Sequence, residues 1–177
     1  MEYRLESGRS FTLVGMNFFG NPFQVAGAWD EDNEIGSLWK RFMAFMTAIP
    51  SPFDALPPGD PAWFEAHVAH PSSEETGAYE VFVGTEVPSP MDVPISCVIK
   101  PFPSTDYAIA TIHGKEMVPG WEERVEADAL GRFGRAINRR WGLQRYDSRF
   151  KGMNLLAESV FEMWIPLLAD ERGGKTI

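Results

Sequence analysis

Residues 159–168 form an apolar run interrupted by one acid, and in a β-strand their side chains would alternate between two faces. One face carries only apolar side chains, namely Phe161, Met163, Ile165 and Leu167. The other face places Glu162 beside Trp164 within the same apolar run. Burying an isolated carboxylate costs several kcal/mol, so Glu162 needs either a fixed partner or an opening. We expect it to line a ligand cavity; the alternative is that it faces water from a one-sided antiparallel sheet.

Two other stretches carry apolar residues at three- and four-residue spacing, which predicts amphipathic helices over residues 31–48 and 119–141. Gly142 suits the position that follows the second helix. Each helix is expected to bury its apolar stripe against a sheet. Trp39 and Phe42 lie on the stripe of the first helix, and their spacing fits core packing and a cavity wall alike.

The remaining apolar runs are short and rich in β-branched and aromatic residues, which favours strands. They cover residues 9–18, 63–70, 78–87, 97–102, 107–113 and 145–150. A proline-rich loop is expected over residues 50–61. A strand, a long helix and further strands thus occur twice, which predicts an α+β domain with two pseudo-repeated halves. Residues 1–170 are expected to form this single domain, and residues 171–177 a disordered tail.

Charge and composition narrow the functional classes. The 177-residue chain has 25 acidic and 16 basic residues, and its net charge of -9 disfavours direct contact with nucleic acid. The macrodipole of the second predicted helix explains a group of basic residues near its end, namely Arg132, Arg135, Arg139 and Arg140. No segment approaches the about 20 apolar residues of a membrane span, and the N-terminus lacks the apolar core of a signal peptide. With one cysteine, Cys97, the chain is expected to be cytoplasmic and not to contact a membrane.

Few residues could support catalysis or metal binding. His67 and His70 are three apart, which points them to opposite faces of the predicted strand, and no motif supplies a third ligand. The sequence contains no Ser-His-Asp or Cys-His signature, phosphate-binding glycine loop or dinucleotide fingerprint. We therefore expect no metal and no cofactor. The remaining catalytic chemistry is that of a carboxylate, with Glu162 as a general base.

Several blocks of the chain together resemble a known family. They are residues 11–15, 35–42, 79–87, 107–114, 146–150 and 162–166. In their order and spacing they are similar to the gyrase-inhibitor-like effector-binding domains, which are also found fused to bacterial multidrug-responsive transcription regulators. The resemblance implies a curved antiparallel sheet, two long helices packed on it, and an aromatic ligand cavity between the two pseudo-repeated halves.

The resemblance also implies which residues bind the ligand. It places Glu162 and Trp164 in the cavity, and Phe42 on the helix stripe is a further candidate. The other aromatic residues carried over are Trp39, Tyr79, Tyr107 and Tyr146. One departure concerns charge, because many family members have a glutamate where this chain has Gln144. Aromatic faces around one carboxylate suit flat apolar ligands and cations.

Three functions remain open. The leading hypothesis is a stand-alone small-molecule binding protein, acting as a sensor or a sequestering agent for hydrophobic, aromatic or cationic compounds. The second, which some relatives of the family suggest, is hydrolysis of strained electrophilic rings such as cyclopropanoid genotoxins, with Glu162 activating a water. The third is an acidic interaction module that binds a basic protein partner such as a topoisomerase; a homodimer is also considered.

Overall fold

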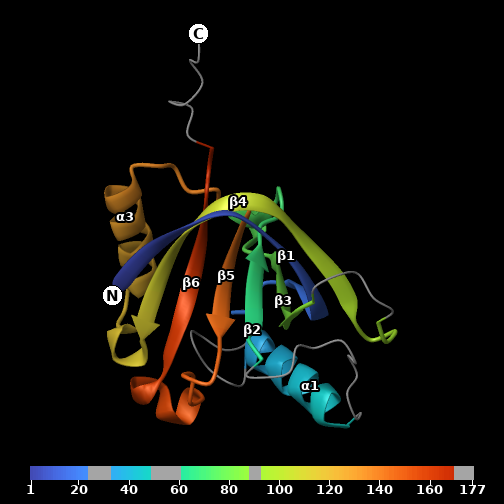
Figure 1. The fold of residues 1–177 in the computed structure, drawn as a ribbon. Coiled ribbons are helices and arrows are strands. Elements are labelled where there is room, and N and C mark those ends of the chain that lie inside the picture. Colours follow the sequence, from blue (N-terminus) through green and yellow to red (C-terminus); the bar gives the residue numbers. More distant parts are fainter. Residues whose placement is uncertain (24–32, 49–60, 88–92, 170–177) are drawn as a thin grey trace.

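The computed structural model (Figure 1) describes four stretches of the chain, residues 1–23, 33–48, 61–87 and 93–169. The predicted proline-rich loop, apart from Pro61, and the predicted tail lie outside the described residues. Among the helices that are described, none combines the length and the apolar character that crossing a membrane requires.

Six antiparallel strands form a closed barrel in the order β1-β3-β2-β5-β6-β4. The strands are β1 (Glu2–Gly20), β2 (Trp63–Val68), β3 (Tyr79–Glu86), β4 (Val98–His113), β5 (Trp141–Tyr146) and β6 (Val160–Leu167). Two longer helices lie outside the barrel, α1 (Glu34–Ala48) and α3 (Trp121–Phe133), as Figure 1 shows. Three short helical segments complete the described fold: α2 (Ser73–Thr76), η1 (Gly114–Glu116) and η2 (Met153–Glu158).

The same succession of longer elements occurs twice, as β1-α1-β2-β3 and then as β4-α3-β5-β6. The two halves join at two ladders, β1 with β4 and β2 with β5. Each strand can be replaced by its counterpart in the other half, β1 by β4, β2 by β5 and β3 by β6. The result is the same ring of strands in the reverse direction, as expected if a pseudo-twofold axis relates the two halves. The predicted fold class, α+β with a curved antiparallel sheet, is confirmed.

The strands of the barrel bury side chains on both faces. A cluster with members from all six strands fills the inside, and its largest members are Phe11, Phe64, Phe82, Phe102, Tyr107 and Trp164. On the outer face, one group of side chains packs against α1 through Leu38 and Phe42. A second group packs against α3 through Trp121 and Val125. The inside of the barrel is therefore a packed core, and both helices cover its outer surface.

The second long helix is shorter than the sequence predicts. It ends at Phe133, because Gly134 adopts a left-handed conformation with φ 61° and its N–H bonds to the carbonyl of Leu130. The apolar spacing beyond this point belongs to other elements, since Ile137 bridges to β6 and Trp141 begins β5. A helical period in the sequence thus continued by coincidence across a helix, a turn and a strand.

The strand boundaries also differ from the prediction. Residues 97–102 and 107–113 belong to one long strand, β4, apart from the single residue Cys97. β5 overlaps the strand predicted at residues 145–150 but begins earlier, at Trp141.

Candidate functional site

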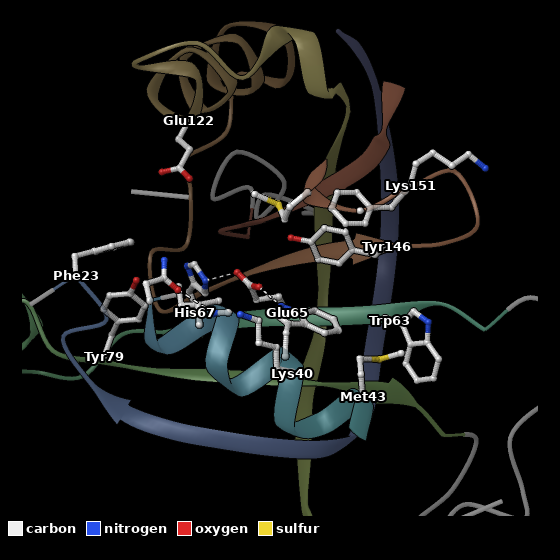
Figure 2. A pocket seen from close by; sticks show the side chains of 17 residues that line it. Phe23, Lys40, Met43, Trp63, Glu65, His67, Tyr79, Glu122, Tyr146 and Lys151 are labelled. Atoms are coloured by element: carbon white, nitrogen blue, oxygen red, sulfur yellow. Dashed lines mark hydrogen bonds and ion pairs between the residues drawn. The ribbon is translucent and has the colours of Figure 1, made fainter. Parts of the chain in front are cut away.

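A pocket of about 600 Å³ lies outside the barrel, where α1 and the first turn of α3 approach the ladder between β2 and β5 (Figure 2). Its volume is within the range of small-molecule sites. Six aromatic side chains line the pocket, namely Phe23, Trp39, Trp63, Tyr79, Tyr146 and Phe150. Ile35, Met43 and Met153 add apolar surface, and the ionisable side chains besides the two tyrosines are Lys40, Glu65, His67, Glu122 and Lys151.

The period of β2 determines which of its side chains reach the pocket. Trp63, Glu65 and His67 point to the outer face and line the pocket, whereas Phe64 and Ala66 between them are buried in the barrel. The outer face of β2 meets β5 in register, and Glu65 stands opposite Gln144. The centre of the pocket floor is therefore the seam between the two halves of the fold.

Glu65 places a carboxylate in this aromatic environment. Its exposed fraction is 5%, and its two oxygens have different partners. The indole Nε1 of Trp39 donates a hydrogen bond to Oε2 at 2.5 Å, and Nε2 of His67 lies 2.8 Å from Oε1 (Figure 2). An ionised carboxylate can accept about four hydrogen bonds, so these two contacts leave acceptor capacity for a ligand.

Two tyrosines in the wall stay protonated over the whole physiological range. Burial raises the pKa of Tyr146 well above its usual value, and the negative charges of Glu65 and Glu122 raise it further. The pKa of Tyr79 is raised by the same causes in the same order. The hydroxyl of Tyr146 donates to Oε1 of Gln144 at 2.6 Å, so this phenol is fixed in place.

Ring contacts hold the aromatic wall together. Trp39 meets Tyr146 edge to face with their ring centroids 5.5 Å apart, and the ring centroid of Phe150 lies 4.8 Å from that of Tyr146. His67 lies 5.2 Å from the ring of Tyr79. These rings come from α1, β2, β3, β5 and the segment after β5, so the tertiary fold preorganises the wall.

Three of the seven predicted ligand contacts line this pocket: Trp39, Tyr79 and Tyr146. Phe42 of α1 does not line the pocket; it is fully buried against the barrel, with its ring centroid 5.8 Å from that of Trp63. Tyr107 is inside the barrel, where its ring contacts Trp164 at 5.7 Å. The roles proposed for Phe42 and Tyr107 in ligand binding have no support from the lining of the pocket.

Neither Glu162 nor Trp164 lines this pocket. Trp164 belongs to the cluster inside the barrel, and Glu162, two residues earlier on β6, projects from the same face of the strand. The Trp164 indole donates to Glu162 at 3.0 Å. Guanidinium groups contact the same carboxylate from Arg4 at 3.0 Å, Arg149 at 3.3 Å and Arg145 at 3.4 Å. The sequence left two possibilities for this acid, a fixed partner or an opening, and the opening was the expected one. In the structure the acid has fixed partners, which are arginines.

The arginines change what Glu162 can do chemically. Burial alone would raise its pKa, but the Trp164 hydrogen bond and the charges of Arg4 and Arg145 outweigh burial, so its pKa lies below the usual value. A carboxylate held ionised in this way is a weak proton acceptor, which disfavours it as a general base at neutral pH.

Sequence reasoning missed the carboxylate that does line the pocket. Glu65 stands between Phe64 and Ala66 in a predicted strand, so the argument applied to Glu162 applied equally here. The other acid of the lining, Glu122, lies in the first turn of α3, where acidic residues are common because they favour the helix macrodipole, so the sequence offers no signal for its place in the pocket.

Comparisons with known proteins agree with this architecture. A search of curated proteins finds no match. Among solved structures, SAV2435 bound to tetraphenylphosphonium aligns with a TM-score of 0.60 and 16% identity, covering 98% of both chains. An integron cassette protein from the mobile metagenome of Vibrio cholerae aligns with a TM-score of 0.56 and 16% identity, covering 94% of this chain and 95% of that one. The C-terminal domain of EcmrR aligns with a TM-score of 0.54 and 10% identity, covering 96% of this chain and 98% of that one.

Because these solved structures share only 10–16% sequence identity with this chain, their similarity establishes the fold alone. The family is established by a family model, described as integron-associated effector binding protein, which matches residues 4–167. The resemblance seen in the sequence is confirmed. This chain belongs to the Cass2 family of integron-associated effector binding proteins, a gyrase-inhibitor-like family that binds small-molecule effectors.

Proposed function

We propose that this protein binds hydrophobic aromatic cations in the pocket between α1 and α3, with Glu65 as the counter-charge. The observation that carries the proposal is a buried carboxylate, 5% exposed, on the floor of a pocket walled by six aromatic side chains. A sensor and a sequestering protein share this binding step.

The chemistry of the wall favours such ligands. Each aromatic face that meets a desolvated cation contributes about 0.5 to 2 kcal/mol, and flat apolar surface is buried in the same contact. Glu65 is held by Trp39 and His67, so it needs little reorganisation to meet a positive charge. An anion of the same shape would approach this carboxylate at a cost.

The structural relative SAV2435 supports the choice of ligand class. That protein has the same fold and is bound to tetraphenylphosphonium, which is a cation surrounded by four phenyl rings. In the present chain Glu65 stands directly across the β2–β5 ladder from Gln144. A negative charge absent at position 144 is therefore available from the adjacent strand, which removes the objection raised by the sequence.

The test compares two ligands of one shape and opposite charge, tetraphenylphosphonium and tetraphenylborate. We expect titration calorimetry to show the cation binding at least about tenfold more tightly to the wild-type protein. Glu65→Gln should weaken the cation about tenfold or more and leave the anion unchanged or improved. Glu86→Gln is the matched control, because Glu86 lies in the same barrel, pairs with Arg9 and is outside the pocket.

Two results would contradict the proposal. One is equal affinity for the two ions, because the carboxylate would then contribute no selectivity. The other is a Glu65→Gln variant that keeps full cation affinity while circular dichroism shows a native fold. The comparison of the two ions uses the wild-type protein, so it tests the proposal even if the Glu65→Gln variant does not fold.

A further inference from the structure

We propose that His67 determines which cations this pocket accepts. When its ring is protonated, it competes with the ligand for Glu65. The site therefore favours aromatic cations that keep their charge at and above neutral pH over weak bases that become charged only in acid. This inference rests on the proposed function and adds the class of cation.

His67 stands next to Glu65 on the outer face of β2. Both residues line the pocket, and Nε2 of His67 lies 2.8 Å from Oε1 of Glu65 (Figure 2). A neutral imidazole this close to a carboxylate carries its proton on Nε2 and donates it as a hydrogen bond. A second proton, which enters at Nδ1, makes the ring a cation in direct contact with Glu65.

This second proton changes what Glu65 offers to a ligand. Among the described residues, no lysine or arginine forms an ion pair with Glu65, so its charge attracts a ligand cation while His67 is neutral. Protonated His67 compensates that charge from within the protein and repels an incoming cation. The coupling is reciprocal, so a bound cation disfavours the protonation of His67. Cation binding must therefore release part of a proton.

The described neighbours of His67 on the adjacent strands do not titrate near neutral pH. On β3, the ring centroid of Tyr79 lies 5.2 Å from that of His67, and burial, followed by the charges of the two lining glutamates, raises the pKa of this phenol. On β5, the residue paired with His67 is Gly142. The pKa of Tyr146, further along β5, is raised by the same causes as that of Tyr79. Both phenols stay neutral.

The other charged side chains of the lining come from neighbouring elements. Among the described residues they are Lys40 of α1, Glu122 of α3 and Lys151 after β5. Lysine amines and carboxylic acids ordinarily keep their charges between about pH 6 and 8, so these groups affect the strength of binding more than its pH dependence. Histidine is the side chain whose charge ordinarily changes there, and the His67 side chain is 33% exposed, so protons reach it from solvent.

The first test uses tetraphenylphosphonium, because its charge does not depend on pH. In titration calorimetry its affinity for the wild-type protein should fall about three- to tenfold from about pH 8 to about pH 5.5. Near about pH 6.5, titrations in two buffers of different ionisation enthalpy should show that binding releases a fraction of a proton. This ligand has no proton to give, so the proton comes from the protein.

His67→Gln should remove most of the pH dependence, because its amide can still donate to Glu65 but cannot gain a charge. At about pH 8 the variant should bind tetraphenylphosphonium within about twofold of the wild type. His70→Gln is the matched control, because it makes the same substitution at an exposed histidine outside the pocket lining. It should keep the wild-type pH profile.

The class of cation is tested with two ligands that share one two-ring shape. 1-Methyl-4-phenylpyridinium is charged at every pH, whereas 4-phenylpyridine becomes charged only in acid. His67→Gln should tighten 4-phenylpyridine about three- to tenfold at about pH 5, where protonated His67 competes with it in the wild type. The same substitution should change the affinity for the methylated ligand by less than about twofold at about pH 8.

The outcomes separate the two proposals. If tetraphenylphosphonium binds better than tetraphenylborate but shows neither pH dependence nor proton release, the inference about His67 is wrong and the proposed function stands. If His67→Gln keeps the wild-type pH profile, or His70→Gln loses it equally, the assignment to His67 is wrong. Proton release is measured on the wild-type protein, so its absence overturns the inference whether or not His67→Gln folds. If tetraphenylphosphonium binds at no pH, both proposals fail together.

Discussion

The barrel carries two buried carboxylates whose immediate surroundings look alike and whose roles differ. Glu65 on β2 is 5% exposed and Glu162 on β6 is 4% exposed. Each accepts a hydrogen bond from an indole, from Trp39 and Trp164 respectively. Burial and an aromatic neighbour therefore do not distinguish a binding group from a structural one.

The difference lies in the cations that surround each acid. Glu162 contacts three guanidinium groups, from Arg4, Arg145 and Arg149, and its charge is compensated within the protein. Glu65 has one ionisable partner among these contacts, His67, which is charged only when protonated. Within the part of the chain that the structure describes, no lysine or arginine forms an ion pair with Glu65 that would compensate its charge as the arginines compensate Glu162. A buried charge of this kind favours a cation from outside, which makes Glu65 the better candidate for ligand binding.

The largest expected effect tests the structural role of Glu162. Glu162→Gln should lower the free energy of unfolding by about 2 kcal/mol, because it leaves three arginines facing one another. This is below the usual cost of breaking a buried pair, since the Arg4 and Arg149 side chains are 46% and 44% exposed. Urea unfolding measures the loss. A stable variant that fails to bind tetraphenylphosphonium would reverse the roles assigned to the two acids.

The second largest effect is expected from acid, which should weaken the ionic cluster that Glu162 and Asp147 form with Arg145 and Arg149. The Arg149 hydrogen bond lowers the pKa of Asp147 from 3.8 to about 2, and the pKa of Glu162 is lowered from 4.5. Groups with lowered pKa values contribute stability that is complete above the unfolded values and is lost as the pH falls through the folded ones. Urea midpoints should therefore fall between about pH 4.5 and 2. In Asp147→Asn the urea midpoint should fall less steeply with decreasing pH. If its dependence on pH is the same as in the wild type, the ionic cluster is not the source of the acid sensitivity.

A smaller effect is expected when the charge of Glu65 is removed from the free protein. Glu65→Gln keeps an oxygen to accept the Trp39 hydrogen bond and removes a buried charge that has no lysine or arginine ion pair among the described residues. The free energy of unfolding should change by less than about 1 kcal/mol without ligand. Urea unfolding of Glu65→Gln and Glu162→Gln under the same conditions compares the two free energies of unfolding directly. A loss as large as that of Glu162→Gln would show that Glu65 is also a structural acid.

The smallest expected effect concerns the positive charge on the α1 side of the pocket. Lys40→Met keeps a long apolar chain and should tighten tetraphenylphosphonium about two- to threefold, because one repulsive charge is removed. Titration calorimetry at low salt checks this. Arg41→Met is the control at a neighbouring exposed position of α1, outside the pocket lining, and should have less effect. Weaker binding in Lys40→Met would mean that Lys40 supports the site.

Much of the architecture could be predicted because it follows from local periodicity. The first helix and the strands around residues 63–70, 78–87 and 159–168 are close to their observed positions. The end of α3 was missed because Ile137 and Trp141 continue a helical spacing although they belong to later elements. Of the residues that line the pocket, the sequence analysis includes Trp39, Tyr79 and Tyr146 among its expected ligand contacts.

The sequence by itself determined that two apolar strands each carry an acid, and that the order of elements repeats. It could not show which acid would be neutralised, because alternation along a strand distinguishes two faces without stating which one lies inside the barrel. That choice was made by tertiary structure, which closes the barrel and brings Arg4 of β1 and Arg145 of β5 to Glu162. The same closure leaves Glu65 on the outer face beneath α1, facing the pocket. Charge compensation over such sequence distances depends on the packing of whole strands, which no local pattern encodes.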